Sequence, residues 1–198
     1  MRSPRRWSRL AHLCLPPGTP VLDALTLSFS ALVLAELGFT RRLGTARAWT
    51  VALAATLAPD LDGLLRFFSP VPVHGLAGGR LHALPVAMGV LVPVLTLLAA
   101  RFPGRRRQPV LPCLLLVLSC VCTHLALDVL GTSGARVFWP WSPQRLALDW
   151  LSSPEPVLWV LLSMVLWLRL LVPDATRAAI HAVVWSALYV GLEGGAHG

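Results

Sequence analysis

The sequence predicts an all-α protein, a polytopic transmembrane bundle of about six apolar helices. Its 198 residues are 56% hydrophobic and 13% charged, whereas about a quarter of the residues in a soluble domain are charged. The mean hydropathy is +0.68. Helices are expected because lipid-exposed backbone must satisfy its own hydrogen bonds, and the alternating pattern of a membrane barrel is absent.

Six apolar stretches supply the helices, since a span needs about 20 mostly apolar residues. They cover residues 20–39, 48–59 with an apolar continuation to 68, 83–100, 109–130, 156–172 and 176–192. Pro59, Asp60 and Asp62 interrupt the second stretch, which is expected to end at the membrane surface or partway in. Residues 101–107 carry four Arg with a Pro and a Gly, so a tight polar loop is predicted there.

The chain is predicted to comprise a basic N-terminal segment, 1–19, and one membrane-embedded helical domain, 20–198. The first apolar stretch could imitate a secretory signal. Asp23, Glu36 and the pair Arg41 and Arg42 argue against that interpretation, because the apolar region of a signal is short, uncharged and directly followed by its cleavage site. We therefore expect a retained first span.

The basic charge indicates a membrane partner. The formal net charge is +8, and all 17 basic residues are Arg, placed where apolar segments end. This placement favours membrane lipid headgroups, and it disfavours nucleic acid, which needs a basic face on a soluble surface. Because Arg residues flank both ends of the predicted spans, the positive-inside rule leaves the orientation open. The four Cys form no paired CxxC set, which disfavours a disulfide framework.

Successive spans reverse direction, so alternate segment ends share one side of the membrane. The start of the first stretch, the end of the second, the start of the third and the end of the fourth are expected on the same side. The ionisable residues at these four places are Asp23, Asp60, Asp62, His74, Arg80, His82, His124 and Asp128.

His124 and Asp128 form the strongest candidate pair. Their i,i+4 spacing places both on one helical face with about 6 Å of rise between them, an arrangement in which two side chains can bind one cation. Ionisable groups in a membrane segment are functional candidates because they are costly to bury. The alternative is a His–Asp hydrogen bond that locks two helices together.

Further ligand candidates lie at the neighbouring segment ends. Asp60 and Asp62 stand between Pro59 and Gly63, where both carboxylates could point inward, although Asp beside Pro and Gly is also ordinary turn chemistry. His74 and His82 precede the third stretch, and His82 is favoured because it enters the apolar segment. A mixed imidazole and carboxylate set suits Zn, Mn or Fe. The predicted catalytic and metal-binding residues are Asp60, Asp62, His82, His124 and Asp128.

Three Arg residues are candidates for binding an anionic substrate group: Arg80, Arg136 and Arg145. Two of them flank Trp139 and Trp141 in the segment after the His–Asp helix. That segment has a second interpretation as an aromatic anchor, because Trp rings favour the headgroup layer. Under the first interpretation, Arg136 and Arg145 would bind a phosphate or carboxylate group over the metal.

These residues resemble the LexA-regulated, membrane-bound metal-dependent hydrolases, described as YdjM-like inner-membrane proteins, over about residues 20 to 156. Four segments carry the resemblance: Asp23 to Thr26 with Ala35 to Gly38, Pro59 to Asp62, Thr123 to Asp128 with Phe138 to Pro140, and Leu148 to Trp150. The chain departs from the family pattern at Leu27, where the family has His. It also departs after His74, where the family's His-Arg-Gly-x-Thr-His-Ser motif is matched only by His74 and the later Arg80, Leu81, His82 and Ala83, with longer spacing and without Thr and Ser, so a divergent member is expected.

The resemblance implies a membrane hydrolase in which the predicted ligands hold one or two divalent metal ions. Such an ion would acidify bound water and polarise the scissile bond. A lipid-like phosphoester is the expected substrate, from the membrane location and the Arg content. The alternative is a non-catalytic membrane protein, either a metal or proton carrier or a scaffold with a degenerate site. A carrier should place polar groups on a path between both faces, whereas here they gather at one.

Overall fold

The computed structural model describes residues 20–61, 80–101, 109–132, 134–151, 156–171 and 176–197. Within these ranges the regular elements are helices, and the described residues contain no β-strand, only two isolated bridges, Gly131 with Leu151 and Ala135 with Leu146. The all-α prediction is therefore confirmed. The α-helices are α1 (Pro20–Glu36), α2 (Phe39–Leu43), α3 (Thr45–Leu57), α5 (Leu84–Val86), α6 (Val92–Arg101), α7 (Val110–Leu130), α8 (Pro156–Leu171) and α9 (Thr176–His197).

Short 3-10 and π-helical turns adjoin α3, α5 and α6. A 3-10 turn, Ala58–Asp60, continues α3, and a second one, Arg80–His82, precedes α5. A π-helical turn, Ala87–Leu91, joins α5 to α6. Each predicted apolar stretch contains a helix, with ends a few residues away from the predicted ones.

Two helical stretches among the described residues are long and apolar enough to cross a membrane: Leu84–Arg101 and Val110–Leu130. Two shorter apolar helices, Ala24–Glu36 and Pro156–Arg169, fall below that length. Length and composition alone therefore identify two spans, fewer than the six that the sequence predicts.

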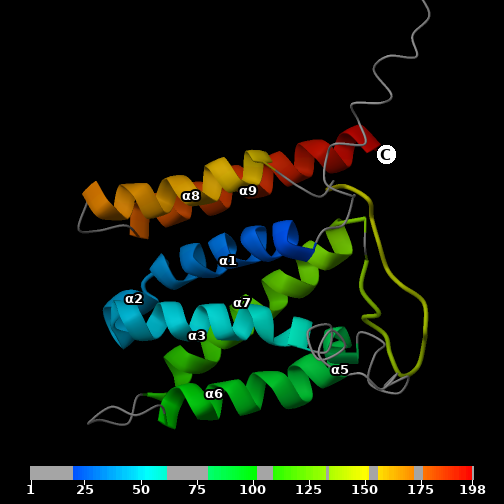
Figure 1. Cartoon of the computed structure of the whole chain (residues 1–198), viewed down its shortest axis with the longest axis horizontal. Coiled ribbons are helices and arrows are strands. Elements are labelled where there is room, and N and C mark those ends of the chain that lie inside the picture. Colours follow the sequence, from blue (N-terminus) through cyan, green and yellow to red (C-terminus); the bar gives the residue numbers. More distant parts are fainter. Residues whose placement is uncertain are drawn as a thin grey trace, which may run out of the picture.

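Small side chains let the central helices approach closely. Figure 1 shows α1, α3 and α7 in the middle of the bundle, with α6 on one side and the pair α8 and α9 on the other. Alanine residues of α1 and α3 are fully buried against the middle of α7, and small residues are typical of helix contacts in membranes. A second core, which includes Val33, Leu158, Leu162 and Val165, joins α8 to α1.

The helix directions agree with the predicted alternation. The end of α3, the start of α5 and the end of α7 lie at the same end of the bundle (Figure 1, right). The opposite end holds α2, which carries Arg41 and Arg42, and the last residue of α6, Arg101. The bundle therefore separates the candidate ligands from this group of Arg residues.

Residues 134–151, called the strap below, run outside the helices at the ligand end (Figure 1). The amides of Leu148 and Trp150 donate to the carbonyls of Val129 and Leu130 at the end of α7, over 2.8 and 3.0 Å. The carbonyl of Val137 accepts from the amide of Leu84 at 2.9 Å. The strap thereby ties the end of α7 to the start of α5.

Glu36 is the most deeply buried acid among the described residues, with 1% of its surface exposed. It accepts hydrogen bonds from Trp49 Nε1 at 2.9 Å and from Thr40 Oγ1 at 3.3 Å. Arg169 Nη1 of α8 lies 3.7 Å from its second oxygen. Because a buried carboxylate is tolerated only with such partners, this group fixes α8 to the junction of α1, α2 and α3.

Candidate metal centre

Asp60 reaches the centre because α3 stops in a 3-10 turn. Pro59 lies in the first positions of that turn, where a missing N–H is tolerated, whereas it would break an α-helix interior. The turn places Asp60 beyond the last turn of α3, with 48% of its side chain exposed.

His82 is positioned by the chain that enters the third apolar segment. It ends the turn Arg80–His82, and Ala83 then takes an extended conformation before α5. Pro85 occupies the first turn of α5, where its fixed φ suits a helix start. The His82 side chain is 15% exposed.

The predicted pair on α7 shares one face. The Nε2 atom of His124 lies 3.3 Å from Oδ2 of Asp128, and His124 is completely buried whereas Asp128 is partly exposed. As the i,i+4 spacing predicts, the two side chains lie on one face of α7 near its end, and their role as ligands stays a prediction.

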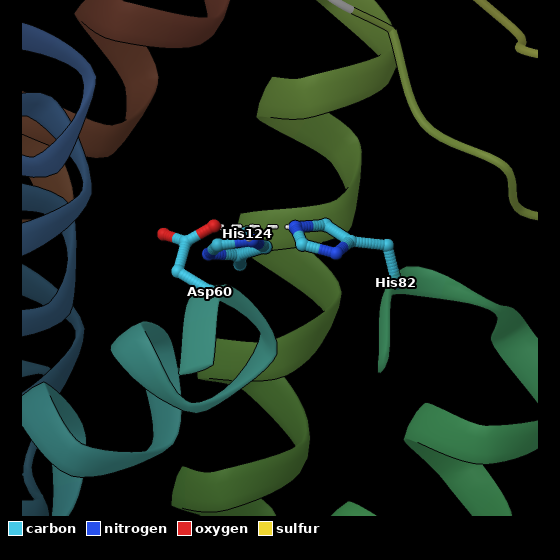
Figure 2. A group of neighbouring side chains, drawn as sticks. All are labelled: Asp60, His82 and His124. Atoms are coloured by element: carbon cyan, nitrogen blue, oxygen red, sulfur yellow. Dashed lines mark hydrogen bonds and ion pairs between the residues drawn. The ribbon is translucent and has the colours of Figure 1, made fainter. Parts of the chain in front are cut away.

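Four side-chain atoms close a ring in which nitrogen and oxygen alternate. Nε2 of His82 lies 3.2 Å from Oδ1 of Asp60 and 3.2 Å from Oδ2 of Asp128. Nε2 of His124 lies 3.3 Å from the same Asp128 oxygen and 3.8 Å from the Asp60 oxygen. Figure 2 shows Asp60, His82 and His124 converging from three separate elements. The ligand atoms of these three residues lie within 4.8 Å of one another.

These spacings fit a metal ion. Four ligands at about 2.0 to 2.1 Å around a tetrahedral zinc are separated by about 3.3 Å, close to the contacts of 3.2 and 3.3 Å. Asp60, His82 and His124 form the group whose ligand atoms all lie near enough to share one ion. The His124 imidazole gives a second indication. Both of its nitrogens are buried without a directed hydrogen bond among the described residues, so Nε2 faces two carboxylates without a hydrogen bond to either. A cation among the four atoms would explain that orientation, since buried polar atoms normally have a partner.

Charge favours the same interpretation. Two carboxylates that share one small space repel each other, and acidic groups in or beside a membrane segment are costly without a partner. One divalent cation would offset both penalties. Protonated imidazoles could do so as well, and the His82 contact with Asp60 has hydrogen-bond geometry. The cluster is therefore either a metal site or a set of His–Asp ion pairs, and metal analysis distinguishes these two alternatives.

The remaining predicted site residues have different outcomes. Asp62 and His74 lie outside the described residues, so their part in the cluster stays a prediction. The Arg80 guanidinium lies 4.9 Å from the centre of the Trp139 ring. Arg136 and Arg145 both lie on the strap, the first half-buried and the second exposed. Leu27, at the position of the family His, is buried in the apolar core.

Sequence reasoning did not foresee the strap or the Arg80 and Trp139 contact. Both depend on residues far apart in the chain, and neither follows from helical spacing. The hydrogen bond from Trp159 Nε1 to Thr26 Oγ1, 2.7 Å long, also joins distant segments. The sequence feature that could have indicated the strap is the Trp-rich segment directly after α7.

Comparison with known proteins gives one result. No curated protein and no solved structure matches the chain. A family model described as "YdjM inner membrane protein" matches residues 23–197, which covers most of α1 and all the later helices together with the cluster and the strap. The chain therefore belongs to the YdjM inner membrane protein family and is an integral inner membrane protein.

Proposed function

We propose that this protein is a membrane-bound metal-dependent hydrolase whose centre is formed by Asp60, His82, His124 and Asp128. The observation that carries the proposal is the closed ring of nitrogen and oxygen atoms, with edges of 3.2, 3.2, 3.3 and 3.8 Å. Asp62, two residues after Asp60, is proposed as a further ligand from its sequence position.

Zinc, manganese or iron is the proposed cofactor. Two imidazoles with two carboxylates form a mixed donor set that suits these metals, whereas Ca and Mg prefer oxygen ligands alone. Asp60, His82 and His124 would supply three ligands of a tetrahedral zinc, and Asp128 is proposed as the fourth.

The differing exposure of the four side chains supports different roles for them in catalysis. A bound divalent cation supplies Lewis-acid polarisation of the scissile bond and acidifies an adjacent water molecule. His124 is completely buried, whereas Asp60 is half exposed and is therefore the one of the two that a substrate could reach. Asp60 makes its cluster contacts through Oδ1, which leaves Oδ2 to accept a proton from the attacking water.

A lipid-like phosphoester is the proposed substrate, because the cluster lies at the end of a membrane helix. The strap beside it exposes Phe138 and Trp141, the latter by 78%. Exposed aromatic rings at such a position are typical of the headgroup layer. Arg136 and Arg145 on the same strap would then contact lipid phosphates.

We propose further that the other long helices also cross the membrane, within the single helical domain 20–198. At 1.5 Å per residue, α1 and α8 reach about 25 Å and α9 about 33 Å, against a hydrocarbon core of about 30 Å. The outer faces of α8 and α9 are strongly apolar, with Trp167, Leu171 and Leu192 more than two-thirds exposed. Lipid is the natural solvent for that surface.

Labelling can test this topology. The test uses two single-Cys variants in a background without native Cys: Arg42→Cys on α2 and Leu61→Cys beside Asp60. One variant should react with an impermeant maleimide in right-side-out vesicles, and the other should react in inverted vesicles. Reaction of both from one side would contradict the arrangement.

Metal content and hydrolysis test the function. The detergent-purified parent should contain about one equivalent of metal and release phosphate from a lipid phosphomonoester such as phosphatidic acid. His124→Ala and Asp60→Asn should lose both metal and activity. A parent that binds no metal and whose thermal stability does not respond to chelator would show that the cluster is a His–Asp lock between helices. A parent that binds metal without hydrolysing such esters would favour a non-catalytic metal protein.

A further inference from the structure

We infer that Trp139 is a positioning residue that holds Arg80 beside the metal centre, where Arg80 binds the phosphoryl oxygens of the substrate. The inference rests on the proposed function and deepens it. Its observation is that Cζ of the Arg80 guanidinium lies over the Trp139 ring, 4.9 Å from the ring centre, where the strap meets the segment that follows His82.

Arg80 and His82 belong to one 3-10 turn. With about 2 Å of rise per residue, the backbone of Arg80 lies within one turn of a candidate ligand. The strap joins this segment directly, because the Val137 carbonyl accepts from the amide of Leu84 at 2.9 Å. Trp139, two residues further along the strap, is thereby fixed next to the turn that carries both Arg80 and His82.

Charge balance gives Arg80 its role. Asp60 and Asp128 neutralise a divalent cation, so a phosphoester that enters the centre adds one or two uncompensated negative charges. A nearby guanidinium is suited to this charge because its planar N–H donors match phosphate oxygens. Arg80 is only half-buried, so a substrate can reach it.

Stacking on Trp139 is compatible with that binding. A guanidinium that packs flat on an aromatic ring uses its face, whereas hydrogen bonds to phosphate form in its plane. Such packing would restrict the rotamers of a long side chain and leave its N–H edges for an anion. Trp141 is the natural comparison, because it lies on the same strap and is 78% exposed.

The test separates metal binding from phosphate binding in detergent-purified protein. Zinc affinity is measured first, by competition with a chromophoric chelator. The zinc-loaded protein is then titrated calorimetrically with inorganic phosphate and, separately, with short-chain phosphatidic acid. The variants are Arg80→Gln, Trp139→Leu, Trp139→Phe and the control Trp141→Leu.

Arg80→Gln and Trp139→Leu should weaken phosphate binding by at least about tenfold, the usual effect of removing a charge-assisted hydrogen bond, with zinc affinity unchanged. Trp139→Phe should recover most of the binding, because it restores an aromatic face, and Trp141→Leu should leave it unchanged. Tighter binding of phosphatidic acid than of inorganic phosphate, lost in Arg80→Gln, would identify a lipid headgroup as the source of the phosphoryl group.

Unchanged phosphate affinity in Arg80→Gln would overturn the inference while leaving the metal centre intact. Equal losses in Trp139→Leu and Trp139→Phe would show that the ring supports the fold and does not position Arg80. If the parent binds none of zinc, manganese and iron, the proposed function fails and the inference fails with it. Arg80→Gln keeps the test decisive even where Trp139→Leu does not fold.

Discussion

Gly194 of α9 packs directly on the indole ring of Trp150 at the end of the strap, and a Cβ atom at this glycine would overlap the ring. The contact joins the last helix to the segment that borders the candidate metal centre. Trp150 in turn donates its amide to the carbonyl of Leu130 at 3.0 Å. The end of α7, the strap and α9 therefore form one packed unit.

Gly194→Ala should destabilise the protein by about 1 to 3 kcal/mol, because the methyl group must displace the Trp150 ring. Gly195→Ala is the matched control, since a Cβ there meets nothing within 4 Å. It should be neutral or slightly stabilising, as Ala favours helix over Gly by about 1 kcal/mol. Thermal unfolding in detergent measures both, and equal melting temperatures would contradict the Trp150 contact.

Gly134→Ala should loosen the strap. Gly134 has φ +62°, and an added Cβ would lie 2.8 Å from the backbone oxygen of Leu146, which cannot move aside without breaking the bridge between Ala135 and Leu146. We expect a loss of about 1 to 3 kcal/mol in stability and faster proteolysis within residues 134–151. Gly89→Ala, where the space is open, is the control. Unaltered proteolysis of the Gly134 variant would contradict this account.

Glu36→Gln should lower the stability by about 1 to 3 kcal/mol without changing the metal content. The substitution removes the charge partner of Arg169, and the partial exposure of Arg169 reduces the loss below that of a fully buried pair. The double variant Glu36→Gln with Arg169→Gln should lose less stability than the sum of the losses of the two single variants, since the residues share one interaction. Strict additivity in thermal unfolding, or a loss of metal, would disprove this separation of roles.

His82→Ala and Asp128→Asn should each reduce zinc affinity by more than about 100-fold, because loss of even an outer-shell partner typically reduces it by 10- to 100-fold. His181→Ala is the control of the same residue type, as His181 is exposed on α9. Chelator competition measures the affinities. An unchanged affinity in either ligand variant would remove that residue from the proposed centre.

The sequence was sufficient for the parts of the site that depend on local periodicity. The length and apolar character of residues 109–130 define α7, and the i,i+4 spacing puts His124 and Asp128 on one face whatever the neighbouring helices do. Alternation of helix directions also predicts that Asp60 and His82 lie at the same end of the bundle. Pro59 predicts that α3 ends nearby, since proline cannot continue a helix without loss of a hydrogen bond.

Local periodicity cannot specify how far apart side chains from different segments lie. Only the tertiary structure brings Oδ1 of Asp60 within 3.2 Å of the His82 imidazole, because that distance depends on interhelical packing and two short turns. The stacking of Arg80 on Trp139 and the packing of Gly194 on Trp150 likewise depend on the path of the strap. By itself the sequence determined an apolar helical protein with an acid and a histidine on one helix face. The packing of small residues between α1, α3 and α7 decided which other groups reach them.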